Sequence, residues 1–166
     1  MSTNNTQPPL RVGVMFEDVQ YADLACVDIL GNLSTKIASG FSSFGAAFDH
    51  FIPQSRPMEF LYVSSTLDPA CMIPGIRALP THTYDTAPRN LDLLVIGGTS
   101  PKGHPESSLK YLREAVRETR VVIGVCTGGL WLAAAGVLED KKATTNRIAL
   151  RVAREMYPSV EWVDQR

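Results

Sequence analysis

Apolar runs of strand length alternate along this chain with longer segments in which apolar residues recur at helical spacing. We expect strands at residues 10–16, 59–64, 91–96, 121–125, 142–145 and 160–163. We expect helices at residues 22–33, 107–119, 126–136 and 147–156. Strands that alternate with helices are typical of right-handed βαβ units. The chain is therefore predicted to form an α/β three-layer sandwich, with a mostly parallel sheet covered by helices on both faces.

Two segments lack a regular pattern. Residues 34–57 are rich in Gly, Ser and Phe, and we interpret them as an exposed or capping loop with room for a short helical turn. Residues 69–88 contain Pro74 and Pro80, which favour short edge strands and turns. Residues 1–9 are polar, so we expect a disordered lead-in followed by one domain over residues 10–166.

Composition narrows the class of protein. The chain has 166 residues, of which 45% are hydrophobic and 20% charged, as expected of one globular domain. A net charge of -1 gives no reason to expect nucleic acid or a membrane as partner. Three widely spaced cysteines and no CxxC pattern favour free thiols in a reducing, cytoplasmic compartment, with no metal and no cofactor.

The candidate chemistry lies where the run at 121–125 ends in Cys126, followed by Thr127, Gly128 and Gly129. A side chain at such a strand-to-helix corner is pushed out of the sheet, and the glycines allow the tight turn beneath it. The positive end of the helix favours the thiolate over the thiol. A buried core cysteine is the alternative, but it explains only the strand and not the Thr-Gly-Gly that follows. We therefore predict a reactive nucleophile at Cys126.

Several motifs of the chain resemble the ThiJ/PfpI superfamily. They are residues 23–30 (DLACVDIL), 92–98 (DLLVIGG), 125–128 (VCTG), 132–138 (LAAAGVL) and 143–146 (ATTN). Cys-Thr-Gly together with an early Asp is most similar to the isocyanide (isonitrile) hydratase branch, whereas the peptidase-like branch typically has His directly after Cys. The resemblance implies a flavodoxin-like fold, similar to class I glutamine amidotransferases. It also implies a homodimer, because relatives commonly dimerise near the active site.

The chain departs from the family in two places. Relatives often have His where Asn146 stands. They also usually continue beyond the position of Arg166 with a further strand, turn and long helix, so the sheet is expected to lack these elements and to leave apolar faces and a strand edge uncovered.

Site roles follow from the chemistry of a thiolate, which needs a proton acceptor and donors for a developing oxyanion. Asp23 is our candidate carboxylate, with Asp28 and Glu17 as alternatives. The N–H groups of Gly97, Gly98 and Thr127 are candidate oxyanion donors, and the Thr127 hydroxyl is a candidate for binding substrate or water. We interpret His50, His82 and His104 as surface residues, with the alternative that His104, beyond the Gly97-Gly98 turn, reaches the cleft. We interpret Cys26 and Cys71 as small buried hydrophobes.

Three hypotheses about function remain open at this point. Cys126 could add to an isocyanide, so that water then releases an N-substituted formamide. It could instead act on an aldehyde, as in a glyoxalase-like enzyme. The third hypothesis is a non-catalytic domain that senses redox state or binds a ligand, since an exposed thiolate oxidises readily. We expect a small-molecule substrate as partner, and no nucleic acid or membrane.

Overall fold

The computed structural model describes residues 7–165 of the chain, so part of the expected lead-in, residues 1–6, lies outside the described residues. Its centre is a five-stranded sheet with the order β5-β2-β1-β6-β7, in which every neighbouring pair is parallel. The strands are β1 Leu10–Met15, β2 Met58–Ser64, β5 His82–Thr83, β6 Leu93–Ile96 and β7 Val121–Gly124. The predicted α/β class with a mostly parallel, flavodoxin-like sheet is confirmed.

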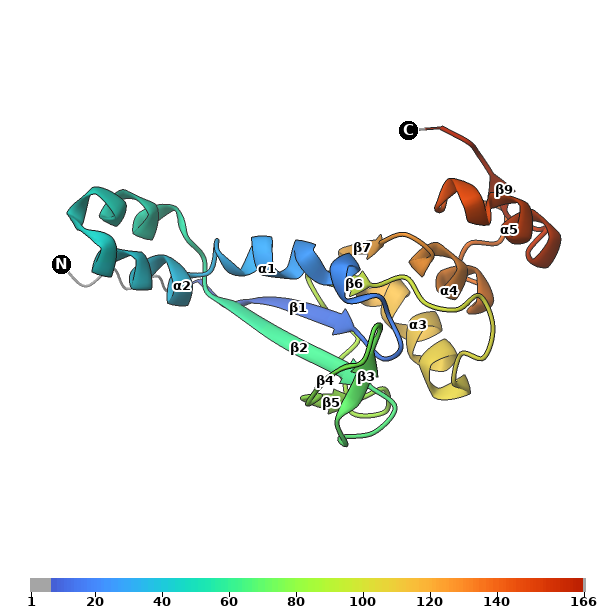
Figure 1. Cartoon of the computed structure of the whole chain (residues 1–166), viewed down its shortest axis with the longest axis horizontal. Coiled ribbons are helices and arrows are strands. Elements are labelled where there is room, and N and C mark those ends of the chain that lie inside the picture. The colour runs from blue at the N-terminus through green and yellow to red at the C-terminus, as the bar shows by residue number, and fades with distance from the viewer. Residues whose placement is uncertain (1–6, 166) are drawn as a thin grey trace.

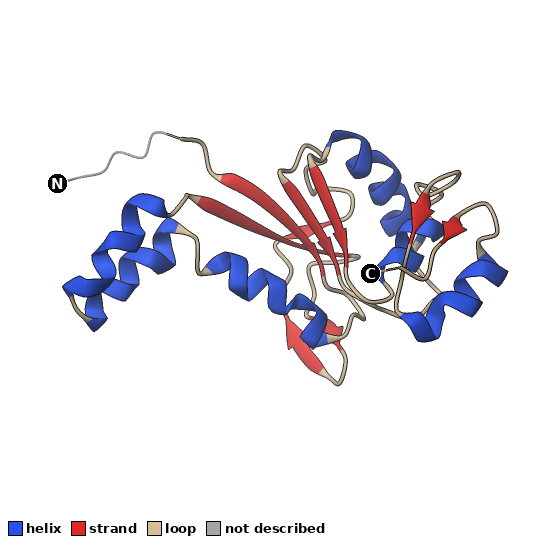
Figure 2. Ribbon diagram, turned by 90° about the horizontal axis from the view of Figure 1, so that it is seen from above, coloured by secondary structure: helices blue, strands red, loops and turns tan. Residues whose placement is uncertain are grey.

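Helices lie on both sides of the sheet, some between its strands and some after β7 (Figures 1 and 2). They are η1 Tyr21–Leu24, α1 Ala25–Gly31, α3 Glu106–Glu118, α4 Gly128–Ala134, η4 Arg147–Ala149 and α5 Leu150–Met156. Several predicted boundaries differ from the observed ones by one or two residues. The first helix begins as a 3₁₀ turn at Tyr21, and the helix after the cysteine begins at Gly128 rather than Cys126.

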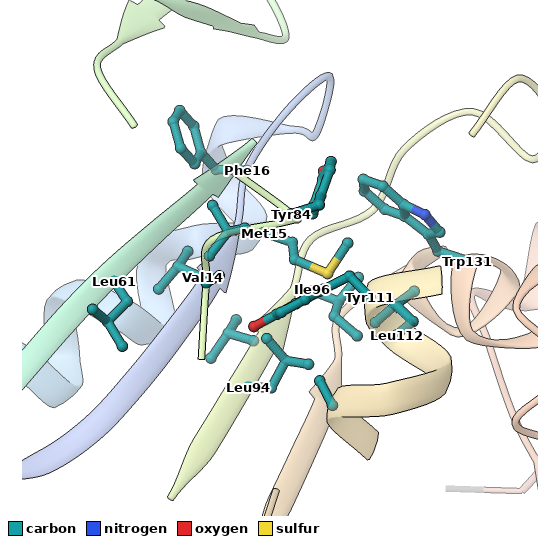
Figure 3. Close-up of a cluster of buried hydrophobic side chains, with 14 of the residues drawn as sticks. Val14, Met15, Phe16, Leu61, Tyr84, Leu94, Ile96, Tyr111, Leu112 and Trp131 are labelled. Carbon is teal, nitrogen blue, oxygen red and sulfur yellow. The ribbon is translucent and has the colours of Figure 1, made fainter. Parts of the chain in front are cut away.

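The core forms where the sheet meets α3 and α4. Figure 3 shows Met15 and Ile96 of the sheet beside Tyr111 and Leu112 of α3, with Trp131 of α4 close by. The core members of β1 and β6 named here are fully buried, as is Trp131. The indole Nε1–H donates to Ser108 Oγ at 3.0 Å inside the protein, which joins α4 to α3. Burial of these large side chains stabilises the packing of α3 and α4 against the sheet, and α4 directly follows the turn that carries Cys126.

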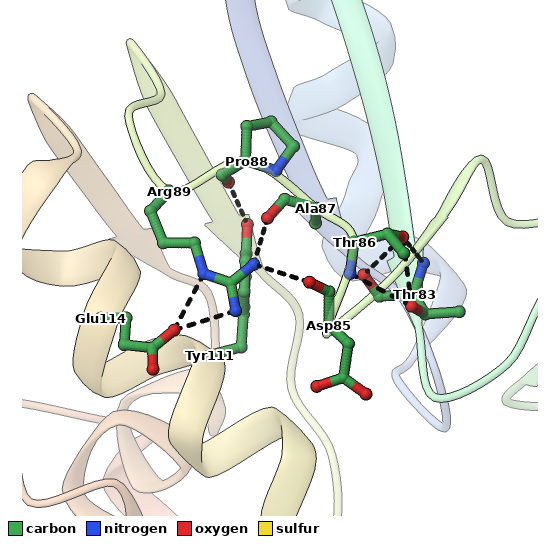
Figure 4. Close-up of polar contacts among 8 residues, drawn as sticks. All are labelled: Thr83, Asp85, Thr86, Ala87, Pro88, Arg89, Tyr111 and Glu114. Carbon is green, nitrogen blue, oxygen red and sulfur yellow. Dashed lines mark hydrogen bonds and ion pairs between the residues drawn. The ribbon is translucent and has the colours of Figure 1, made fainter.

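A polar cluster around Arg89 ties the chain before β6 to α3 (Figure 4). The guanidinium contacts Glu114 Oε2 at 2.9 Å and lies over the ring of Tyr111, 5.1 Å from its centroid. Tyr111 in turn donates its hydroxyl hydrogen to the carbonyl of Pro88 at 3.2 Å. Burial raises the pKa of Tyr111 to about 12, so the ring keeps this donor.

Two small sheets flank the main one. β3 Ala70–Met72 and β4 Ile76–Ala78 form an antiparallel pair, as expected for the proline-containing segment. β8 Lys142–Ala143 and β9 Glu161–Trp162 pair in parallel and pack with α5. No helix within residues 7–165 is long and apolar enough to cross a bilayer.

Residues 34–57 differ most from expectation. Instead of a loop they form a helical hairpin, built from α2 Thr35–Gly40, η2 Phe41–Phe44 and η3 Ala46–Gln54. Ser34 caps α2 by accepting a hydrogen bond from Ile37 N–H, and Gly45 turns the chain with a φ of 122°. The hairpin projects from the body beyond the amino-terminal ends of β1 and β2 (Figure 1). We call residues 35–54 the arm.

Candidate active site

Cys126 lies on the tight turn between β7 and α4. Its φ is 56°, in the left-handed region that residues with a side chain rarely adopt. The turn is closed by Gly128 N–H, which donates to the carbonyl of Val125 at 2.8 Å. Gly128 packs directly against the backbone of Ile96, which leaves no room for a side chain. The half-buried thiol is therefore held on the strand-to-helix corner that the sequence predicted, and its role as a nucleophile stays a prediction.

The strand-to-helix segment after β8 supports the thiol from the other side. Asn146 Nδ2 lies 3.5 Å from Cys126 Sγ and donates to it. The Asn146 Oδ1 accepts from Ile148 N–H at 3.2 Å, which orients the amide so that its NH₂ faces the sulfur. Thr145 Oγ1 donates to the Cys126 carbonyl at 2.9 Å and fixes the same segment. Sequence reasoning noted Asn146 only as a departure from the family, and no spacing in the chain indicated its contact with the sulfur.

Replacing Asn146 by Ser is expected to slow the alkylation of Cys126 about tenfold. Ser retains the acceptor that caps η4 but cannot reach the sulfur, so only the hydrogen bond to the thiolate is lost. The rate of iodoacetamide labelling at Cys126, followed by mass spectrometry, measures this effect. Asn32→Ser, at the end of α1, is the matched control and should label at the parental rate. An unchanged rate in Asn146→Ser would show that the amide does not assist the thiolate.

Gly98, directly after β6, is the point where the predicted site residues converge. A side chain placed on Gly98 would begin 2.5 Å from Asp23 Oδ2, 2.9 Å from Thr127 Oγ1 and 3.0 Å from Cys126 Cβ. Gly98 is buried, and its N–H donates to Asp23 Oδ2 at 2.9 Å. The absence of a side chain is thus what allows the carboxylate, the hydroxyl and the thiol-bearing carbon to meet.

The three candidate carboxylates have different surroundings. Asp23 is half-buried in the η1 turn and faces Gly98 beside the cysteine. Glu17 Oε2 accepts from the backbone N–H and the hydroxyl of Ser65, at 3.1 and 2.7 Å. Asp28 is exposed on α1 and lines a groove at the base of the arm. The structure therefore brings Asp23 to Cys126, and neither Glu17 nor Asp28 has a contact with the cysteine.

The N–H groups expected to stabilise an oxyanion differ in whether the protein already occupies them. The N–H of Gly98 is occupied by Asp23, and a side chain placed on Gly97 would meet Val19. The Thr127 hydroxyl donates to the carbonyl of Thr99 at 2.9 Å. Within residues 7–165 the backbone N–H of Thr127 has no acceptor, so this donor is available to a ligand. A glycine pair in the sequence does not reveal which of its N–H groups a neighbouring carboxylate takes.

His104 is half-buried, so the structure favours the alternative that it reaches a cleft over the surface position predicted first. Its ring stacks on Trp131 with 4.8 Å between centroids and 12° between planes. Its Nε2 is buried without a hydrogen-bond partner. The residue lines a cavity of about 280 Å³ together with Thr99, Lys102 and Trp131. The sequence held one signal for this contact, because Trp131 lies on a helix within reach of the loop that carries His104.

We expect the free energy of unfolding to fall on acidification in a way that depends on His104. Burial lowers the pKa of this histidine in the folded protein. The contribution of neutral His104 to the free energy of unfolding is complete above the unfolded pKa of about 6.5. This contribution is lost as the pH falls from there through the lower folded pKa, because in that range only the unfolded chain takes up the proton. Urea unfolding of the parent and of His104→Phe at two pH values, one on each side of this range, measures the difference. His104→Phe should lose less stability on acidification, and the exposed His50→Gln is the control that should behave as the parent does.

The cysteines other than Cys126 are not the buried pair expected from the sequence. Cys71 is exposed on β3, and its thiol contacts the carbonyl of Met72 at 3.6 Å. Cys26 is half-buried on α1, 3.7 Å from the carbonyl of Asp23. The apolar neighbours of Cys71 in the chain do not reveal its exposure, because β3 and β4 form a ribbon outside the main sheet.

The fold and this turn define a class of α/β proteins that carry a cysteine on a strained strand-to-helix corner. Comparison with known proteins gives the family: residues 47–166 match the DJ-1/PfpI family, and the chain belongs to it. Over 83 residues, 48% of this chain and 36% of the other, it is 36% identical to isonitrile hydratase from Pseudomonas putida.

Solved structures show the same fold. A ThiJ/PfpI family protein from Pseudomonas syringae matches with a TM-score of 0.68 at 20% identity, over 96% of this chain and 59% of that one. DJ-1 from Schizosaccharomyces pombe matches with a TM-score of 0.61 at 14% identity, over 94% and 77% of the two chains. An AraC family transcriptional regulator from Pseudomonas putida matches with a TM-score of 0.62 at 17% identity, over 95% and 77%. The fold thus occurs in proteins of different kinds, among them a transcriptional regulator.

Proposed function

We propose that this protein is a cysteine-dependent enzyme that adds water to an isocyanide and releases an N-substituted formamide. The observation that carries the proposal is the convergence of Asp23, Thr127 and Cys126 on Gly98, with Cys126 held on a left-handed turn. The partial likeness to isonitrile hydratase supports the choice of substrate class.

In the proposed reaction the Cys126 thiolate attacks the terminal carbon of the isocyanide R–N≡C. A proton is delivered to that carbon, giving a thioimidate R–N=CH–S–Cys126. Water then adds to the same carbon, and the nitrogen takes up a proton to give R–NH–CH(OH)–S–Cys126. Collapse of this adduct forms the C=O bond as the hydroxyl proton passes to Asp23, expels the thiolate and releases R–NH–CHO. The sum is R–N≡C plus H₂O giving R–NH–CHO, with the enzyme unchanged.

Three residues of the chain have separate roles in this reaction. Asn146 Nδ2 stabilises the thiolate before attack and after its expulsion, because it already lies 3.5 Å from the sulfur. Asp23 receives the thiol proton and passes it to the substrate carbon, and its carboxylate is kept in place by Gly98 N–H. The free N–H of Thr127 supports the negative charge that develops during addition.

Asp23→Asn is expected to lower kcat about 100-fold or more, with a much smaller change in KM. The amide oxygen can still accept from Gly98 N–H, so the shape of the site is preserved while the proton acceptor is lost. Steady-state kinetics with an alkyl isocyanide measures the effect, and the exposed Asp28→Asn is the matched control. Equal kcat values in Asp23→Asn and the parent would show that Asp23 does not transfer the proton.

The proposal is tested by incubating the purified protein with cyclohexyl isocyanide and following N-cyclohexylformamide by mass spectrometry. In H₂¹⁸O the formamide oxygen should be labelled, because water supplies it. Methylglyoxal is offered in a parallel reaction. Turnover of methylglyoxal without formamide would favour the glyoxalase-like alternative, and no turnover of either compound would favour a non-catalytic role.

A further inference from the structure

A cavity of about 280 Å³ begins one residue away from the candidate active site. It lies between the loops after β1 and β6, the turn of the β3–β4 hairpin and α4. Its lining includes Thr99, which directly follows Gly98 and whose carbonyl accepts the hydroxyl hydrogen of Thr127 at 2.9 Å. It also includes Trp131, which lies about 6 Å beyond Thr127 along α4. A short substituent on a group bound to Cys126 therefore has this cavity within reach.

Two carboxylates line this cavity, those of the half-buried Glu17 and the exposed Asp18. Glu17 Oε2 accepts from the backbone N–H and the hydroxyl of Ser65, at 3.1 and 2.7 Å. Asp18 has a left-handed backbone with a φ of 56°, and its N–H donates to the carbonyl of Cys71 at 2.8 Å. Both residues are thus held in place by backbone contacts. Within residues 7–165 neither carboxylate forms an ion pair.

The other two titratable residues of the lining are Lys102 and His104. Lys102 is exposed, and its ammonium group has no ion-pair partner in the described part of the chain. Burial lowers the pKa of His104, so its ring adds no positive charge at neutral pH. Two carboxylates and one ammonium group therefore leave one negative charge in excess around the cavity.

The rest of the lining is in part apolar. Ile73, Pro105 and Trp131 contribute hydrocarbon surface to the cavity. Sites for small ligands typically combine such surface with a few charged or polar groups at defined positions. The cavity therefore suits a group with a hydrocarbon body and a positive charge, which the excess carboxylate compensates.

We infer that this cavity binds the substituent of the substrate and selects one that ends in a cationic group, such as a quaternary ammonium. The inference rests on the proposed function, in which Cys126 attacks the carbon of R–N≡C and R is joined to that carbon through one nitrogen. The methyl groups of a quaternary ammonium gain apolar contacts, and its charge requires no hydrogen-bond acceptor in a fixed direction. The carboxylates of Glu17 and Asp18 attract this charge, whereas Lys102 opposes it.

Labelling of Cys126 by three methanethiosulfonates tests the inference without requiring turnover. The reagents transfer a 2-(trimethylammonio)ethyl, a 3,3-dimethylbutyl or a 2-sulfonatoethyl group to the thiolate, form a disulfide with it and release methanesulfinate. The first two groups have the same shape, so the ratio of their rates reports the effect of charge. Dividing this ratio by that for 2-mercaptoethanol removes the intrinsic difference between the reagents and gives the cation preference. Mass spectrometry of peptides separates the labelling of Cys126 from that of Cys71 and Cys26. We expect a cation preference of about tenfold, with the sulfonate transferred most slowly.

Glu17→Gln/Asp18→Asn should lower the cation preference at least about threefold, because both negative charges of the cavity are lost. The amide oxygen of Gln can still accept from Ser65, and Asn tolerates the left-handed backbone. Glu139→Gln/Asp140→Asn is the matched control. It changes the same pair of residues at an exposed position outside the cavity, where Asp140 has a φ of 57°. The control should keep the parental preference. The Asp23 carboxylate is present in every variant, so its effect on the labelling is the same throughout.

Lys102→Gln provides an independent variant in case the carboxylate variant does not fold, which urea unfolding verifies. It removes the opposing charge from an exposed side chain and should raise the cation preference about threefold. Equal labelling by the cationic and the neutral reagent in the parent would overturn the inference. So would a preference that Glu17→Gln/Asp18→Asn retains in full, since Asp23 would then be its source. Faster transfer of the sulfonate would make an anion the ligand and Lys102 its partner.

Turnover separates this inference from the proposed function. The kcat/KM for 2-(trimethylammonio)ethyl isocyanide should exceed that for 3,3-dimethylbutyl isocyanide by about the same factor as the labelling rates. Turnover of both isocyanides with equal kcat/KM would overturn the inference and leave the hydratase activity in place. Turnover of neither, with the cation preference in labelling intact, would refute the hydratase and leave a cation-selective cavity beside Cys126.

Discussion

Cys126→Ser is expected to lower kcat/KM for an isocyanide at least about 1,000-fold, which corresponds to about 4 kcal/mol of transition-state stabilisation. A serine hydroxyl is a much weaker nucleophile than a thiolate at neutral pH, and the amide of Asn146 cannot compensate for that difference. The free energy of unfolding should change little, because the two side chains are similar in size and the backbone conformation is unchanged. Formamide production and urea unfolding measure the two quantities.

Cys71→Ser is the matched control, because it makes the same substitution at an exposed cysteine remote from Gly98. It should retain the activity of the parent. In the parent protein, iodoacetamide should modify Cys126 before Cys71, although Cys71 is the more exposed of the two. Faster labelling of Cys71 would show that exposure, not the turn and the Asn146 amide, controls reactivity. Formamide production by Cys126→Ser would exclude this cysteine as the nucleophile.

Gly98→Ala is expected to lower activity about 100-fold while Cys126 remains present. The new methyl group would begin 2.5 Å from Asp23 Oδ2, and the nearby Thr127 Oγ1 and Cys126 Cβ leave it no free direction. The carboxylate must therefore move, and a displacement of about 1 Å at a reacting group costs on the order of 100-fold in rate. Steady-state kinetics and the rate of Cys126 labelling together measure the effect.

Gly31→Ala is the control for this substitution. Gly31 ends α1 with nothing within 4 Å of a new side chain, so Ala should be tolerated and should slightly favour the helix. An active Gly98→Ala variant, with kcat close to that of the parent, would mean that the site can open without loss. In that case Asp23 would not need its present position for catalysis.

The sequence predicted the main elements because their local signals were strong. The apolar runs that became β1, β2, β6 and β7 have no competing pattern, and the parallel sheet follows from the helices between them. The arm was missed because residues 34–57 bury almost nothing, so they lack the apolar periodicity on which the prediction depends. Short 3₁₀ turns such as η2 and η3 add to the difficulty, since their period differs from that of an α-helix.

By itself the sequence determined the fold class and placed a cysteine on a strand-to-helix turn, because both depend on residues that are neighbours in the chain. It left open which carboxylate, which N–H and which amide would meet that cysteine. Those choices were made by the tertiary structure. Asp23, Gly98 and Cys126 follow β1, β6 and β7, and they converge because parallel strands bring their carboxyl ends to one edge of the sheet. Asn146 follows β8, outside this sheet, and joins them through the hydrogen bonds of residues 145–146 to Cys126. The exposure of the arm was decided in the same way, since whether an apolar side chain is covered depends on what the rest of the fold places against it.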